Sequence, residues 1–132
     1  MTNKILVRSM IVWLGIIPMA FINGGLREYV LIPLIGQIAL PLSGVILCAM
    51  VFFLSYIFVP RLGKGTQGTY IIIGLIWIVS TILFEFLLGF LIGETFANML
   101  NSYNVFTGNL WLIVVLFIGF SPWLAAKRNK MI

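Results

Sequence analysis

The sequence predicts an all-α integral membrane protein with four transmembrane helices and a short interfacial or re-entrant helical segment between the first two. Two observations favour this fold class. Hydrophobic residues make up 62% of the 132 residues and charged residues only 8%, whereas soluble domains carry about 25% charged residues. Four apolar stretches, each long enough to span a bilayer as a helix, are separated by short connections. The length fits one transmembrane helical domain and leaves no room for a separate soluble one.

The first predicted helix covers residues 5–22. Lys4 and Arg8 stand near its start, as basic residues do in a signal peptide. Its apolar core is long enough to span, however, and no small-residue cleavage site follows, so we expect a retained helix. Pro18 is expected to kink this helix near its far end because proline removes one backbone hydrogen bond.

A shorter apolar segment follows the first helix. The tripeptide Asn-Gly-Gly at residues 23–25 predicts a helix break because glycine has a permissive backbone. The next apolar run is interrupted by Pro33 and Pro41 and is too short to span. We therefore expect a short helix over residues 26–38, which lies on the outer face of the bundle or dips into it.

Three further apolar stretches complete the predicted bundle, at residues 42–59, 70–92 and 110–126. Trp111 and Trp123 stand near the two ends of the last stretch, where an aromatic belt would place them. The connection between the second and third helices contains several glycines but lacks the spacing of a phosphate-binding loop, so no nucleotide site is expected.

The distribution of basic residues predicts the orientation. With four spans, the two termini and the middle connection share one side of the membrane, and that side carries seven basic residues, whereas the other side carries only Arg27. The seven are Lys4, Arg8, Arg61, Lys64, Lys127, Arg128 and Lys130. Because basic residues are retained on the cytoplasmic side, we expect a multi-pass protein of the bacterial inner membrane with both termini in the cytoplasm.

The composition also excludes several classes of function. The chain has no histidine, no aspartate and a single cysteine, Cys48, so histidine-based metal, haem and catalytic-triad sites and a CxxC redox pair are excluded. We expect no cofactor and no metal, and the basic residues lack the aromatic interleaving of a nucleic-acid site. An enzyme is not expected, since no spacing singles out a nucleophile and a base among Ser80, Thr81, Tyr103, Glu85 and Glu94.

Glu85 is the only charged residue of the third predicted helix, about 10 Å from its outer end. A carboxylate at membrane depth is costly unless it is neutralised, paired or hydrated. It shares a helix face with Gly74, Trp77, Thr81 and Gly89, and that face should meet protein or water rather than lipid.

Arg27 is the only cation on the same side of the membrane, so it is expected to pair with Glu85 or Glu94. Asn23, Gln37, Thr81 and Asn109 are available to complete the hydrogen bonding. The predicted site on this outer side comprises Glu85, Arg27, Glu28, Glu94, Thr81, Asn23 and Gln37.

Two functions follow from this cluster, and both stay open. Intramembrane ionisable residues mark substrate and ion paths, so the chain could be a small transporter or channel component with an outward-facing pocket for a small cation, a proton or a polar ligand. The alternative is a structural or accessory membrane subunit in which an Arg–Glu cluster only fixes the fold. Expected partners are membrane lipids and a second copy of the chain, through the close-packing pair Gly89 and Gly93.

The stretch from Gly24 to Tyr29 resembles the glycine-rich, arginine-bearing opening of small fluoride channels, which are four-helix chains of similar size. Glu28 departs from that pattern, and the uneven distribution of basic residues departs from the inverted dimers of that family. Small multidrug exporters are similar in size, but their glutamate belongs to the first helix, where this chain has none. No family is assigned from these resemblances.

Overall fold

The computed structural model describes residues 3–101 and 111–132, and within these ranges the chain forms helices and connections without a strand. The four longest helices are α1 (Asn3–Leu26), α3 (Ala39–Phe58), α4 (Gln67–Leu91) and α6 (Trp111–Arg128). Shorter elements join them: η1 (Arg27–Leu31), α2 (Ile32–Ile35), η2 (Gly36–Ile38), η3 (Val59–Arg61) and α5 (Phe96–Asn101). The predicted all-α architecture is confirmed.

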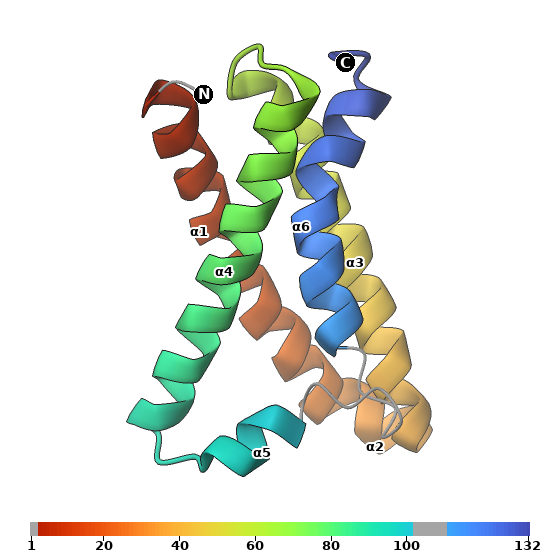
Figure 1. The fold of residues 1–132 in the computed structure, drawn as a ribbon. Helices are drawn as coiled ribbons and strands as arrows, with labels where there is room; N and C mark the ends of the chain where they lie inside the picture. The colour runs from red at the N-terminus through yellow and green to blue at the C-terminus, as the bar shows by residue number, and fades with distance from the viewer. Residues whose placement is uncertain (1–2, 102–110) are drawn as a thin grey trace.

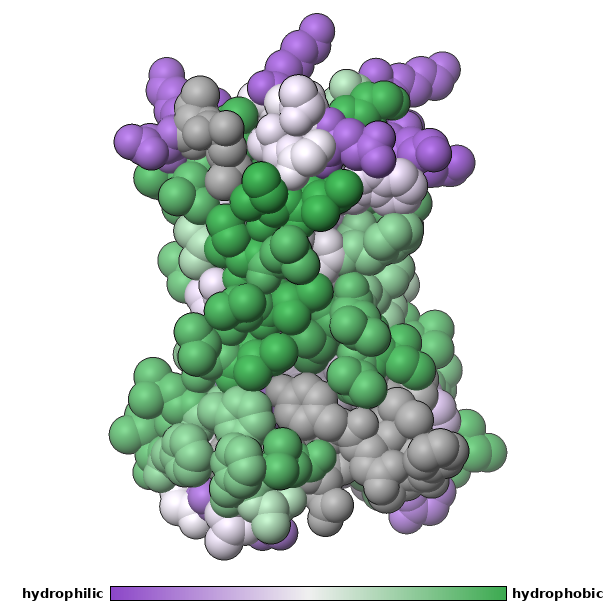
Figure 2. Space-filling model, viewed as in Figure 1, coloured by the Kyte–Doolittle hydropathy of each residue, from purple (hydrophilic) through white to green (hydrophobic). Residues whose placement is uncertain are grey.

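The long helices form one elongated bundle in which consecutive helices run in opposite directions (Figure 1). Both ends of the chain and the connection between α3 and α4 lie at one end of the bundle, and α2 and α5 lie at the other. Figure 2 shows that hydrophobic residues cover the middle of the molecule, while hydrophilic side chains gather at the end with the termini. The seven basic residues counted above therefore share one end.

Three helical stretches are long and apolar enough to cross a membrane: Asn3–Arg61, Gln67–Leu91 and Trp111–Arg128. The first stretch contains both α1 and α3, because the segment between them is helical throughout. These stretches agree with a multi-pass membrane protein. The number of crossings and the side of the membrane on which each end lies stay predictions.

The expected helix break at residues 23–25 is wrong. The α1 helix runs through Asn-Gly-Gly to Leu26 and continues directly into the π-helical turn η1. The chain reverses later, at Gly36, whose φ of 70° lies in the left-handed region that favours glycine. A short helical segment between the first two long helices is thus present, but it is an extension of α1 ending in a turn.

Helices α4 and α6 approach each other very closely at Gly74 and Gly119. A Cβ atom added to Gly74 would lie 1.8 Å from the carbonyl oxygen of Gly119, so only glycine lets the two backbones approach this far. The neighbouring core is filled by side chains with less than 2% exposure, among them Tyr70, Ile73 and Trp77 of α4. The buried side of α4 therefore faces protein, as expected for the face that carries Gly74 and Trp77.

The two ends of α4 are capped by local hydrogen bonds. The Thr66 hydroxyl accepts from the backbone N–H of Thr69, and the Thr69 hydroxyl accepts in return from the backbone N–H of Thr66. At the other end, Gly93 takes a φ of 86°, and the N–H of Glu94 bonds to the carbonyl of Gly89 at 2.9 Å. This is a Schellman cap. Gly93 is thus needed to end the helix, and its part in a homo-oligomer stays a prediction.

Candidate functional site

A cavity of about 480 Å³ lies among α1, η1, α3, α4 and α6. Its lining comes from the second half of α1, the first half of α3, the second half of α4 and the first half of α6. These four half-helices meet in the part of the bundle that ends in α2 and α5, away from the termini (Figure 1). The cavity is therefore confined to one half of the molecule.

The cavity brings together five of the seven predicted site residues, from three different elements: Asn23, Arg27, Glu28, Thr81 and Glu85. The other two do not line it. Gln37 is exposed in η2, and Glu94 is exposed just beyond the end of α4. Among the residues predicted to contribute, Tyr103 and Asn109 lie outside the described ranges.

Glu85 is half-buried in the second half of α4, and its carboxylate accepts a hydrogen bond of 2.5 Å from the indole N–H of Trp111. This contact joins α4 to the first residue of α6. The sequence placed Trp111 in an aromatic belt, and its bond to Glu85 was not predicted. A general signal was present, since the indole N–H is a donor that needs an acceptor when it is buried.

Arg27 does not form the expected ion pair with Glu85 or Glu94. Its Nε lies 3.3 Å from Oε1 of Glu28, its neighbour in the chain. The Arg27 side chain is 31% exposed and that of Glu28 is 56% exposed. The two opposite charges thus form a local, partly exposed pair on the cavity wall.

A pair of reciprocal tryptophan contacts joins α1 to α4 at the inner end of the cavity. The indole N–H of Trp13 donates to the hydroxyl of Thr81 at 3.0 Å, and the indole N–H of Trp77 donates to the backbone carbonyl of Ser9 at 3.1 Å. The Thr81 hydroxyl donates in turn to the carbonyl of Trp77 at 2.7 Å. We call Trp13, Thr81, Trp77 and Ser9 the clamp. Trp13 and Thr81 line the cavity, and Ser9 and Trp77 lie one helical turn nearer the end that holds the termini.

Asn23 differs from the other polar residues of the cavity. Its side chain is held by α1 among apolar neighbours and is only 3% exposed, yet its amide nitrogen has no hydrogen-bond partner in the part of the chain that the structure describes. An unpaired buried amide costs about 1–3 kcal/mol. Asn23 lines the cavity, so a bound acceptor that reached this nitrogen would satisfy it.

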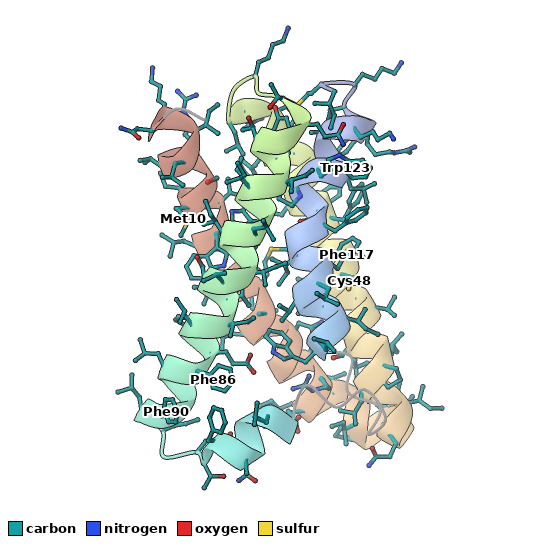
Figure 3. The ribbon with its side chains drawn as sticks, viewed as in Figure 1. Met10, Cys48, Phe86, Phe90, Phe117 and Trp123 are labelled. Atoms are coloured by element: carbon teal, nitrogen blue, oxygen red, sulfur yellow. The ribbon has the colours of Figure 1, made fainter. Side chains whose placement is uncertain are left out.

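The remaining lining is mostly apolar. Trp13 and Phe84 pack edge to face, with ring centroids 6.3 Å apart, and aliphatic side chains such as Ile16, Ile17 and Leu88 continue the wall. Gly25 also lines the cavity, and a Cβ atom placed there would meet nothing within 4 Å. Outside this lining, Phe86 of α4 packs against Phe90 of the same helix and Phe96 of α5, with ring centroids 6.5 and 5.8 Å apart; Phe86 and Phe90 are labelled in Figure 3.

The geometry gives no catalytic pair among the described residues. Thr81 uses its hydroxyl both to accept from Trp13 and to donate to the Trp77 carbonyl, so it is engaged in the clamp rather than directed at a carboxylate. Ser80 does not line the cavity. The arrangement is suited to binding: charges of both signs and one unsatisfied donor beside an apolar wall.

Comparison with known proteins gave no match: no family model, no curated protein and no solved structure is significantly similar to this chain.

Proposed function

We propose that the protein is a small multi-pass transporter or channel component with four spanning helices, and that the cavity is its ligand-binding pocket. One observation carries this proposal. Five polar residues from α1, η1 and α4, distant in sequence, line one cavity, and the clamp joins α1 to α4 beside it. Convergent polar groups in a mostly apolar pocket are the usual form of a small-ligand site.

The orientation belongs to the same proposal. Seven of the eight basic residues are found at the termini and in the α3–α4 connection, and basic residues favour the cytoplasmic side of a bacterial inner membrane. The cavity would then face outward, and the clamp would separate it from the cytoplasm. A transported cation, proton or polar ligand would have to pass the contacts of Trp13 with Thr81 and of Trp77 with Ser9.

The experiment measures transport in proteoliposomes. Proton entry is followed with an internal pH dye and K⁺ or Na⁺ entry with ion-sensitive dyes, for the natural protein and for Glu85→Gln. Glu94→Gln is the matched control because Glu94 is exposed and does not line the cavity. We expect Glu85→Gln to abolish the pH-dependent flux at unchanged thermal stability, and Glu94→Gln to retain it. Flux that persists in Glu85→Gln while thermal stability falls would show the transport role to be wrong.

A structural or accessory subunit is the second candidate, and a specific observation favours it. Glu85 bonds to Trp111, and Arg27 pairs with Glu28, so both charged groups have partners within the chain. Such contacts can hold a fold without doing chemistry. On this interpretation, Trp111→Phe lowers the stability of the bundle because it removes the donor of this bond. Glu85→Gln lowers it less, because the amide oxygen can still accept from Trp111, and neither variant alters ion flux.

A further inference from the structure

We propose that the cavity binds a zwitterionic phospholipid, with its headgroup against Asn23, Arg27 and Glu28 and an acyl chain along the apolar wall. This inference rests on the proposed function in taking the cavity as the ligand site. It adds the chemical class of the ligand and the route by which the ligand enters. Each part of the lipid, namely its phosphate, its ammonium group and its acyl chain, matches a feature of the cavity.

The phosphate of the lipid would accept hydrogen bonds from the N–H donors of Asn23 and Arg27. Asn23 is only 3% exposed, and its amide nitrogen lacks an acceptor within the described chain. The Arg27 guanidinium carries five N–H donors, and its one hydrogen bond within the described chain uses Nε. Arg27 also lies close to Gly24, since a Cβ added at Gly24 would be 3.9 Å from its terminal nitrogen. A phosphate bearing several acceptor oxygens can bond to both side chains at once.

The ammonium group of the lipid would lie near the carboxylates of the cavity. Glu28 and Glu85 both line the cavity, with Arg27 as its one cation among the described residues. A simple anion would meet more acidic than basic side chains. A simple cation would leave the Asn23 donor buried without an acceptor, which costs free energy. A ligand that carries both charges satisfies the donors and the carboxylates together.

The acyl chain of the lipid would pack along the apolar wall and leave the cavity past its exposed lining residues. Ile16, Ile17 and Leu88 extend the wall along α1 and α4. Two lining residues are strongly exposed, Phe21 at 57% and Tyr29 at 85%. Exposed aromatic side chains at a cavity rim suit entry from the bilayer, because aromatic residues are stable at the membrane interface. A water-soluble ligand would gain little binding free energy from contact with this apolar wall.

The test is native mass spectrometry on the delipidated full-length protein in detergent. Phosphatidylethanolamine, phosphatidylglycerol and the free headgroup phosphoethanolamine are added in separate titrations. We expect phosphatidylethanolamine to bind at one site at least tenfold more tightly than phosphatidylglycerol, and phosphoethanolamine not to bind. Equal binding of the two lipids would overturn the choice of a zwitterion. Binding of phosphoethanolamine as tight as that of the lipid would overturn the choice of an amphiphile.

Two variants locate the site. Gly25→Leu puts a side chain into open cavity space and should lower lipid affinity at least tenfold, whereas Ala49→Leu adds the same type of side chain at an exposed position of α3 and should not. Asn23→Leu removes the unpaired amide, so it should raise the melting temperature of the lipid-free protein and also lower lipid affinity tenfold. Unchanged affinity in Gly25→Leu and Asn23→Leu would place the lipid elsewhere and refute the proposal.

Trp123, in the half of the bundle that holds the termini, provides a control for Asn23→Leu. Trp123 also has a buried indole N–H without a partner in the described chain, but it does not line this cavity. Trp123→Phe should therefore leave lipid affinity unchanged. The two proposals fail separately: lipid binding without any Glu85-dependent flux contradicts the proposed function, and flux without selective lipid binding contradicts this inference alone.

Discussion

Among the glycines whose surroundings the structure describes, Gly74 should be the one at which alanine is most disruptive. The new Cβ would lie 1.8 Å from the carbonyl oxygen of Gly119, whereas real Cβ atoms essentially never come within 3.0 Å of an atom outside their own residue and its chain neighbours. The obstacle is backbone, so no side-chain rotation relieves it. Helices α4 and α6 would have to separate by about 1.2 Å or more along this contact, judged from those two distances.

The expected loss of stability follows from that separation. A radial gap of ~0.5–1 Å already forfeits about a quarter to a half of the dispersion energy of a contact. Overpacking of a tight core typically costs ~1–3 kcal/mol, occasionally more. We place Gly74→Ala at about 3 kcal/mol, the upper end of that range, because the clash is with a main-chain atom. Gly119→Ala should cost less, since its closest contact is the side chain of Ile78, at 2.1 Å.

Gly25→Ala is the matched control, since the same methyl group is added to a helical glycine. Its Cβ would meet nothing within 4 Å, and alanine is favoured over glycine in a helix by ~0.5–1 kcal/mol. The two substitutions should thus have opposite signs. The assay is unfolding of the purified protein in mixed micelles by added SDS, followed by tryptophan fluorescence. Equal effects of Gly74→Ala and Gly25→Ala would refute the assigned α4–α6 crossing.

Three more predictions concern the clamp, the cap and the orientation. In a double-mutant cycle, Trp13→Phe and Thr81→Val should couple by about 0.6–1.7 kcal/mol, which are the average and the maximum for hydrogen bonds between membrane helices, and zero coupling would contradict the contact. Gly93→Ala should cost ~1–2 kcal/mol in the SDS assay because its backbone is left-handed, and a neutral effect would contradict the cap. In a cysteine-free background, an impermeant maleimide added outside should label Glu94→Cys and not Lys64→Cys, and the reverse pattern would invert the proposed orientation.

The sequence predicted the long helices because their cause is local. An apolar run of sufficient length forms a helix wherever water cannot satisfy its backbone, and the four predicted stretches each overlap one long helix. The same physics explains the wrong break at residues 23–25. Each glycine costs a helix about 1 kcal/mol relative to alanine. That cost is smaller than the cost of leaving backbone groups unpaired in an apolar setting, so α1 continues to Leu26.

The partners of the charged residues could not be predicted in the same way. The composition of the site followed from a count of polar residues in apolar surroundings, which is a property of the sequence. Which of them touch depends on where α6 begins relative to α4 and on side-chain conformations. Trp111 reaches Glu85 across that interface, and Arg27 turns back to Glu28. Neither contact has a characteristic spacing in the sequence.

The cavity contains two kinds of polar group, and the difference between them bears on function. Glu85, Arg27 and Thr81 each bond to a neighbouring residue, which is what a purely structural cluster requires. Asn23 is buried as deeply as any of them, faces the same space, and leaves its amide without a partner in the described chain. A side chain that only stabilised the bundle would gain from being apolar at this position, since the unpaired amide costs free energy. Asn23 is therefore the residue at which a structural role explains least and a bound acceptor explains most.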